Sequence, residues 1–426
     1  MKKPKFQTPT GMHDILPKDQ KYFQKIYEIL ENIADFYGFV KIETPILEET
    51  ELFSRGIGIG TDIVQKEMFN LRTKGGDYLS LRPEGTAPLV RAYIEKGMFN
   101  FPQPVKLWYF GPYFRYEKPQ AGRFRQFWQF GFEVLGEKNS ILDAQIIQIF
   151  YNILKKLKFK NLLIEINSIG DSQCRPYYKK LLTSFLRSRE KGLCADCRRR
   201  AKTNPLRIFD CKQEKCQRIV SQAPQTIDHL CDECRQHLKE VLEFLDEIPL
   251  PYHLNSHLVR GLDYYTKTVF EIIEDTPRGK ALGSLVGGGR YDNLVKLLGG
   301  KDTPAVGGAA GIDRIIASMK EKKIHFPAKR KPQVFLAQLG KSAKRKSLKL
   351  FEEFRNANIQ IAESLGRDSL KAQLARADKL GSSQALILGQ KEALEGTIII
   401  RDMKTGKQET VKLEKVVEEI KKKLKK

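Results

Sequence analysis

Two strand-like segments joined by a charged loop constrain the fold of this chain more than any other feature. Leu107–Glu117 and Gln126–Leu135 are both rich in aromatic side chains, which favour β-strands. The polar loop between them contains Lys118, Pro119, Gln120, Gly122 and Arg123. This order predicts an antiparallel hairpin with a long, charged connection.

The second of these segments has two unlike faces. Because side chains alternate along a strand, one face carries four apolar residues that we expect to pack into a core: Trp128, Phe130, Phe132 and Val134. The other face carries Gln129, Gly131 and Glu133. An amide and a carboxylate on either side of a glycine suit a small polar ligand that lies over Gly131 and carries an ammonium group or a protonatable ring. The alternative is an ordinary solvated face.

The pattern of apolar residues divides the chain into two domains. We predict one domain over residues 1–325, interrupted at about 170–250 by an insertion of helical pieces that holds the cysteines. A basic linker is expected at 326–332. Strands and helices alternate from 333 to 426, which predicts a separate α/β domain.

Size and charge restrict the class of protein. The 426 residues contain no run approaching the ~20 apolar residues of a membrane span. The basic N-terminus is not followed by the apolar run of a secretory signal, so we expect a cytoplasmic protein without a membrane partner. The formal net charge of +24 favours a nucleic-acid partner, although a basic soluble protein is the plain alternative.

Several short motifs combine arginines with carboxylates and tyrosines. They are Arg82–Thr86, the group Arg115, Glu117 and Arg123 around the hairpin loop, and Val259–Tyr265. Guanidinium groups hold phosphate oxygens in pairs, and tyrosines offer both a ring face and a hydroxyl. Taken singly, these motifs also fit surface charge, RNA backbone contact or a buried aromatic pair.

Two segments of small residues, Gly287–Arg290 and Ala305–Arg314, are expected to lead into helices. Small residues allow a planar base to approach closely, and a helix start favours phosphate, with Arg314 in the first turns. The sequence contains neither the lysine-bearing phosphate loop nor the glycine fingerprint of dinucleotide-binding folds.

The cysteines indicate metal or plain thiols rather than disulfides, because the chain is long and lacks a secretory signal. Cys194 and Cys197 form one C-x-x-C pair, and Cys231 and Cys234 form another. We predict that the two pairs bind one structural Zn²⁺ through four thiolates, with Cys211 and Cys216 as alternative ligands. Reduced thiols without metal are the other interpretation.

Taken together, these motifs resemble the histidyl-tRNA synthetases of the class II aminoacyl-tRNA synthetases. The resemblance covers essentially the whole chain and is most specific at Arg82–Thr86, Phe114–Glu133 and Leu258–Tyr265. It implies an α+β fold, in which a catalytic core built on an antiparallel sheet carries a helical insertion and is followed by an α/β anticodon-binding domain. It also implies a homodimer formed through the region around Phe39–Pro45. Asp313 stands where many relatives have Glu, which is a conservative change.

The resemblance also implies substrates and roles. The substrates are histidine, ATP with Mg²⁺ and tRNA(His), and the two residues expected to be catalytic are Arg115 and Arg260. Histidine would be bound by Glu84, Gly85, Thr86, Arg115, Gln129, Glu133, Arg260, Tyr264 and Tyr265. ATP would be bound by Arg115, Glu117, Arg123 and Arg314.

Two other functions are compatible with parts of this pattern. One is a non-catalytic histidine sensor, but such proteins typically lack the C-terminal domain and lose catalytic arginines, which this chain keeps. The other is a ligase for a different amino acid, which the Tyr264–Tyr265 signature opposes.

Overall fold

The computed structural model describes residues 5–119, 122–277, 279, 283–326, 332–366 and 368–424. The chain divides into two compact units, Met1–Phe326 and Pro327–Lys426. Gln120 of the predicted loop and residues 327–331 of the predicted linker lie outside the described residues. None of the described helices combines the length and the apolar character that crossing a lipid bilayer requires.

The first unit is built on an eight-stranded sheet with the order β1-β5-β6-β11-β10-β9-β7-β8. The inner neighbours from β5 to β7 are all antiparallel, and only β1 and β8 at the two edges pair in parallel. The strands are β1 (Val40–Lys41), β5 (Val105–Phe114), β6 (Gln126–Leu135), β7 (Leu162–Ser168), β8 (Tyr252–Leu254), β9 (Thr266–Glu274), β10 (Val286–Arg290) and β11 (Ala305–Gly311).

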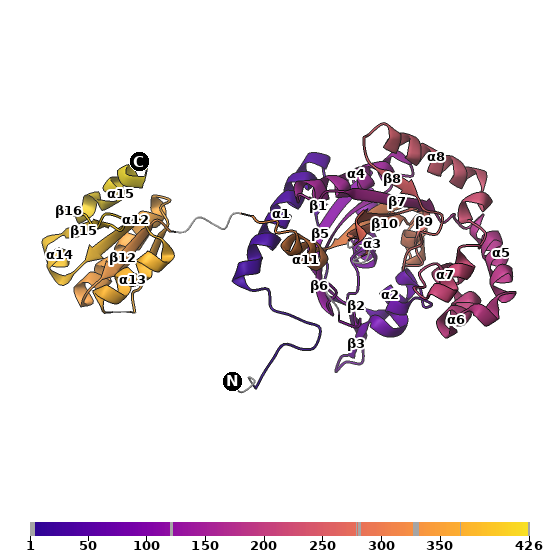
Figure 1. Ribbon diagram of the computed structural model, residues 1–426, viewed down its shortest axis with the longest axis horizontal. Coiled ribbons are helices and arrows are strands. Elements are labelled where there is room, and N and C mark those ends of the chain that lie inside the picture. Colours follow the sequence, from indigo (N-terminus) through magenta and orange to yellow (C-terminus); the bar gives the residue numbers. More distant parts are fainter. Residues whose placement is uncertain are drawn as a thin grey trace. The chain divides into compact units, whose positions relative to one another are not determined.

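One face of this sheet is covered by helices (Figure 1). The covering helices are α1 (Pro17–Tyr37), α4 (Ile141–Lys156), α8 (Asp232–Asp246) and α11 (Ile312–Glu321). Phe130, Phe132 and Val134 of β6 are fully buried in the resulting core, and Trp128 packs against it. The alternation predicted for this strand is therefore confirmed, and the opposite face of β6 is left for the functional site.

Two local predictions were wrong in their boundaries. The first hairpin strand begins at Val105 and ends at Phe114, so Arg115 and Glu117 belong to the loop rather than to the strand. The passage at Gly287–Arg290 does lead into a helix, α10, but it is itself the strand β10, and the helix is shorter than predicted. Gly288 pairs with Phe270 on one side and with Gly308 on the other, and its missing side chain leaves room for the Phe270 ring.

The open face of the sheet is bordered by a small sheet and by the insertion. The small sheet has the order β2-β4-β3, with β2 at Leu47–Glu49, β3 at Phe69–Arg72 and β4 at Tyr78–Leu81. Its flanking segments are α2 (Thr50–Ile57), η1 (Ile63–Glu67), α3 (Thr86–Glu95), η2 (Met98–Asn100) and α10 (Leu294–Leu297). The insertion is helical, as predicted, with α5 (Arg175–Arg187), η3 (Glu190–Gly192), α6 (Ala195–Thr203), η4 (Pro205–Ile208), α7 (Glu214–Val220), η5 (Thr226–His229) and α8.

The second unit is an α/β domain built on a five-stranded sheet with the order β13-β12-β14-β15-β16. The strands are β12 (Val334–Gln338), β13 (Ile361–Glu363), β14 (Gln384–Leu388), β15 (Thr397–Asp402) and β16 (Gln408–Lys412). The fully buried strands β12 and β14 lie between two cores, one on each face, as expected for parallel central strands. The helical segments are α12 (Lys341–Asn356), α13 (Leu370–Leu380), α14 (Gln390–Glu395), η6 (Leu413–Lys415) and α15 (Val416–Leu424).

A buried ion pair fastens α4 to the sheet beneath the site. Arg290 at the end of β10 and Asp143 in α4 are both fully buried, and an Nη2 of Arg290 lies 2.5 Å from Oδ2 of Asp143. Nε2 of His237 in α8 lies 3.2 Å from the other Asp143 oxygen. Burial opposes ionisation of Asp143, but the Arg290 charge prevails and lowers the pKa of Asp143 to about 2.

We predict that Arg290→Leu lowers the free energy of unfolding of the first unit by about 3–5 kcal/mol, because it leaves a buried carboxylate without its partner. The matched control is Lys296→Leu, which breaks the exposed pair with Asp302 and should change stability by less than about 0.5 kcal/mol. Urea unfolding measures both changes.

The ion pair of Asp143 and Arg290 also predicts a pH dependence. In the wild type its contribution to stability is complete above pH 3.8, the ordinary pKa of Asp, and is lost as the pH falls toward about 2.

Candidate active site

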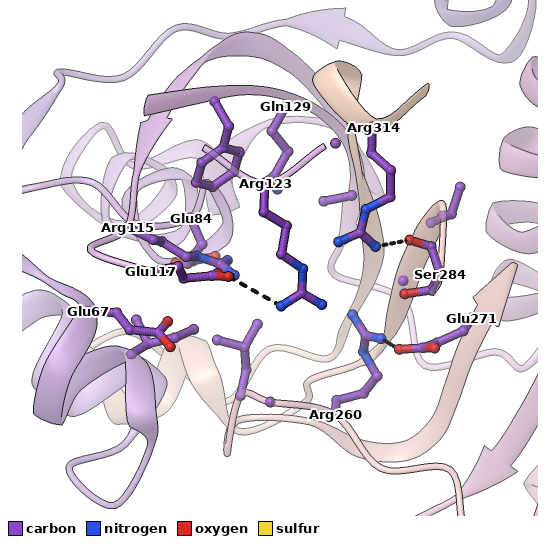
Figure 2. A pocket seen from close by; sticks show the side chains of 18 of the residues that line it. Glu67, Glu84, Arg115, Glu117, Arg123, Gln129, Arg260, Glu271, Ser284 and Arg314 are labelled. Atoms are coloured by element: carbon purple, nitrogen blue, oxygen red, sulfur yellow. Dashed lines mark hydrogen bonds and ion pairs between the residues drawn. The ribbon is translucent and has the colours of Figure 1, made fainter. Parts of the chain in front are cut away.

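A cavity of about 520 Å³ lies over the open face of the sheet in the first unit. Its lining includes the loop before α3, the hairpin loop between β5 and β6, the segment 259–265, the glycine-rich strands β10 and β11, and residues of η1 and of the insertion. Figure 2 shows Arg115, Arg123, Arg260 and Arg314 around this cavity. Motifs far apart in the sequence therefore converge on one space.

The hairpin loop contributes two guanidinium groups that share one carboxylate. Nη1 of Arg123 donates to Oε2 of Glu117 over 3.3 Å, and Nη1 of Arg115 lies 3.9 Å from Oε1 of the same residue. Nε of Arg115 also donates to the carbonyl of Pro83 over 2.9 Å. These contacts fix the direction of both arginines but leave other N–H groups facing the cavity, where an anion can accept them.

Arg260 enters from the opposite wall and is held by Glu271 of β9, with which its Nη1 forms an ion pair. Burial and the opposing Arg260 charge act in opposite directions on the pKa of Glu271, and burial prevails, so that pKa is raised. Gly287 makes this position possible, because a Cβ there would lie 2.0 Å from Nη2 of Arg260. The Nε of Arg260 is buried and finds no hydrogen-bond partner among the residues that the structure describes.

Arg314, in the first turn of α11, donates through Nη1 to the carbonyl of Ser284 over 2.5 Å. Burial lowers the pKa of Arg314, and the nearby positive charge of Arg123 lowers it further. Two like charges that face one cavity favour a polyanion between them. Asp313 also borders the cavity, and its Oδ2 accepts the backbone N–H of Trp128 over 2.6 Å, which ties α11 to β6.

A network of buried acids forms the opposite end of the site. Glu84 accepts the backbone N–H groups of Thr86 and Ala87, over 2.7 and 2.8 Å. Oγ1 of Thr86 donates to Glu133 over 2.8 Å, and the hydroxyl of Tyr291 donates to the other Glu133 oxygen over 2.7 Å. Burial raises the pKa of Glu84, and it raises the pKa of Glu133 to about 8. A cation placed here would favour the ionised form of both carboxyl groups.

Two tyrosines stand beside this acidic end. Tyr264 and Tyr265 are buried, both line the cavity, and their ring centroids lie 4.7 Å apart. The hydroxyl of Tyr264 lies 3.5 Å from Oε2 of Glu84. Burial raises the pKa of Tyr265 to about 12, so both its proton and its ring face remain available to a ligand at neutral pH.

Some predicted binding residues do not lie on the cavity wall. The expectation of a ligand over Gly131 is wrong, because the Tyr109 ring fills that space and would meet a Cβ at 2.4 Å. Glu133 lies one layer back, behind Thr86 and Tyr291. Gly85 is a packing residue, since a Cβ there would meet Tyr109 at 2.5 Å. Gln129 does line the cavity, and its Nε2 donates to the hydroxyl of Tyr109 over 3.3 Å.

The insertion supplies a wall that the sequence analysis did not identify. Arg200 and Arg207 both contact Oδ2 of Asp62, over 2.8 and 3.1 Å, and Asp210 accepts from Arg207 over 3.2 Å. Burial raises the pKa of Asp210. The only sequence signal was the density of charged residues in Arg198–Lys212, between two cysteines, which by itself is typical of any solvated loop.

The predicted joining of the two C-x-x-C pairs is wrong, whereas the alternative ligands Cys211 and Cys216 do lie with the first pair. Cys194 and Cys197 lie with Cys211 and Cys216, whereas Cys231 and Cys234 lie with Asp171 and Cys174. The reason is the path of the chain, which carries the first pair onto α6 and the second onto the start of α8. Neither group is part of the cavity lining.

Comparison with known proteins identifies the family of this chain. The family model described as "Histidyl-tRNA synthetase" matches residues 11–315, and an anticodon-binding domain model matches residues 333–423. The chain belongs to the histidyl-tRNA synthetase family. It is 45% identical over 420 residues to a histidine–tRNA ligase of Dehalococcoides mccartyi, which covers 98% of this chain and 100% of that protein.

Other relatives lead to the same family. A histidine–tRNA ligase of Desulforamulus reducens is 44% identical over 410 residues, covering 96% of this chain and 97% of that protein. The crystal structure of apo histidyl-tRNA synthetase from S. aureus superposes with a TM-score of 0.80 at 34% identity, covering 98% of this chain and 100% of that chain. The predicted α+β fold of class II synthetases, with its C-terminal anticodon-binding domain, is confirmed.

We predict that Gly287→Ala lowers histidine-dependent ATP–pyrophosphate exchange by about 10²-fold, because the added methyl group displaces the Arg260 guanidinium. Gly60→Ala is the matched control, since a Cβ at Gly60 meets nothing within 4 Å. Exchange kinetics on both variants test the effect. Wild-type activity in Gly287→Ala would show that the position of Arg260 is not critical.

Proposed function

We propose that this cavity activates histidine with ATP to histidyl-adenylate and then transfers the histidyl group to the 3′ end of tRNA(His), releasing AMP and pyrophosphate. The chain is an aminoacyl-tRNA synthetase, and this is the reaction of its family. The observation that carries the assignment is the polarity of the cavity. Four guanidinium groups line one part of it, and Glu84 with two phenols lines another, while Glu133 lies in the layer behind Thr86.

The acidic end is the proposed site of the histidine amino group. The ammonium lies against Thr86 and Glu84, while Gln129 contributes its side-chain amide. Glu133 acts from the layer behind by accepting the hydroxyl of Thr86, which leaves a Thr86 lone pair for the ammonium. Tyr264 and Tyr265 border the imidazole and offer a ring face and hydroxyl groups that a ring nitrogen can pair with.

The cationic end is the proposed site of ATP. Arg123 and Arg314 hold the outer phosphates, with Glu117 fixing the direction of Arg123. Arg115 and Arg260 face the α-phosphate from two sides, and Arg115 also holds the histidine carboxylate. In the first step a carboxylate oxygen attacks the α-phosphorus and pyrophosphate leaves. Charge builds on the equatorial phosphate oxygens, where fixed guanidinium groups stabilise it.

No general base is required for this step, because the histidine carboxylate is already ionised at neutral pH. Mg²⁺ enters as part of the nucleotide substrate and neutralises charge on its outer phosphates. In the second step a hydroxyl of the terminal ribose attacks the carbonyl of the adenylate, and AMP leaves. The cavity aligns the two reactants, which by itself provides a large part of the rate enhancement.

We predict that Arg260→Ala still binds histidine and ATP but forms the adenylate at least about 10²-fold more slowly, because one fixed charge at the α-phosphate is lost. Histidine-dependent ATP–pyrophosphate exchange measures the rate, and calorimetry measures binding of each substrate. Arg218→Ala, on the exposed surface of α7, is the control and should match the wild type. Unchanged exchange in Arg260→Ala would remove the proposed role.

The same proposal assigns the remaining parts of the chain. Residues 1–325 form the catalytic domain, and residues 333–426 bind the anticodon of the tRNA. The high positive charge of the chain favours binding to RNA phosphates.

The enzyme works in the cytoplasm as a homodimer. The dimer contact is proposed around Phe39–Pro45, because Phe36, Val40 and Ile46 are exposed there beside the edge strand β1. Such an apolar patch is typical of an interface.

We predict that Val40→Asp converts the dimer to a monomer, because a two-fold interface would place the new carboxylate in contact with apolar residues twice. Analytical ultracentrifugation measures the mass. Leu394→Asp, which adds the same charge at an exposed leucine of α14, should leave the mass unchanged. A wild-type chain that sediments as a monomer at micromolar concentration would contradict the proposal.

A further inference from the structure

Four cysteines in the insertion come together although they are spread over 23 residues. Cys194 precedes α6, Cys197 lies in its first turn, Cys211 follows η4, and Cys216 lies in α7. Their sulfur atoms all lie within 4.8 Å of one another. Sulfur atoms around a tetrahedral Zn²⁺, each bound at about 2.3 Å, lie just under 4 Å apart, so a small inward movement completes that geometry.

The backbone around these sulfurs provides hydrogen-bond donors. The N–H of Cys197 points to Sγ of Cys194 over 3.4 Å, and the N–H of Cys194 points to Sγ of Cys216 over 3.3 Å. A thiolate has no proton to donate, so it can only accept hydrogen bonds, and backbone N–H groups supply them here. Three of the four cysteines are buried, so unpaired thiolates without a cation would be costly here.

The second group of cysteines differs in chemistry. There the sulfurs of Cys174 and Cys231 lie 3.7 and 3.9 Å from Oδ1 of Asp171, which can accept their protons. Cys174 also lies 3.9 Å from Sγ of Cys234. Neutral thiols satisfy this arrangement without metal. The first group consists of sulfur alone and contains no carboxylate that could accept a thiol proton, so a cation is the partner that would balance four thiolates there.

We propose that Cys194, Cys197, Cys211 and Cys216 bind one structural Zn²⁺ through four thiolates. The spacing C-x₂-C followed by C-x₄-C gives two short chelating loops, which is the usual construction of such sites. All four coordination positions are filled by protein, so the metal has no open position for substrate and its role is structural.

The segment between the two pairs explains what the metal does for this enzyme. Nη1 of Arg207 donates to the carbonyl of Gly261 over 3.3 Å, and Nδ2 of Asn204 donates to Asp263 over 2.7 Å. Both acceptors belong to the loop that carries Arg260. Arg200 and Arg207 hold Asp62 on the other side. Zn²⁺ bound at both ends of this segment positions a wall of the cavity and, through it, the Arg260 loop.

Metal analysis by mass spectrometry tests the site. Wild-type protein purified in reducing buffer without added metal is expected to contain at least about one equivalent of Zn²⁺ per chain, and Cys216→Ser is expected to contain about one equivalent less. Cys231→Ser, in the second group, is the matched control and keeps the zinc. Wild-type protein with less than about half an equivalent, or Cys216→Ser with wild-type zinc content, overturns the proposal.

Alkylation of the wild-type chain provides a second measurement that does not depend on how a variant folds. Peptide mapping should find these four cysteines unreactive toward iodoacetamide in the native protein and reactive after the zinc is removed by a chelator. Hydrogen exchange on the same two samples should become faster in residues 198–212 and 260–263 and stay constant in 334–388. Equal alkylation before and after chelation contradicts the site, and unchanged exchange at 260–263 contradicts its link to Arg260.

Discussion

Like charges repel, and four arginines can share one cavity only because each is anchored to a fixed acceptor. Glu117 lies between Arg115 and Arg123, Glu271 holds Arg260, and the carbonyl of Ser284 holds Arg314. These anchors lie on the hairpin loop, β9 and the segment before β10. The guanidinium groups are therefore already in place before substrate arrives, and little reorganisation is needed when charge develops on phosphate oxygens. The rest of the fold serves to keep these anchors at fixed distances.

The sheet does this by having two unlike faces. One face packs Phe130, Phe132 and the helices α1, α4, α8 and α11 into a rigid core, and the buried pair of Asp143 and Arg290 adds a polar connection through that core. The other face is lined by glycines where space is required. Gly287 leaves room for Arg260, and Gly307 leaves room for Glu133. The strand alternation in the sequence thus produces both the support and the site.

Much of this arrangement was predictable from the sequence because it rests on local patterns. Alternation along β6 gave the buried face, and the density of arginine, carboxylate and tyrosine motifs indicated the cavity. What could not be predicted depends on contacts between distant segments. The Tyr109 ring over Gly131, the layer that separates Glu133 from the cavity and the wall formed by Arg200 and Arg207 all arise when the chain folds back on itself. The cysteine grouping failed for the same reason, since identical C-x-x-C spacings do not reveal which pairs meet.

The hydrogen bonds that Glu84 accepts at the start of α3 affect how a substrate is oriented in the cavity. A helix start normally attracts anions through its free N–H groups. Here two of those groups, from Thr86 and Ala87, are already occupied by the chain's own carboxylate. A phosphate therefore finds no attraction at this end and is repelled by the acid. Glu84 and the guanidinium groups line the same cavity, so a zwitterionic amino acid can turn its ammonium group toward the acid and its carboxylate toward the arginines.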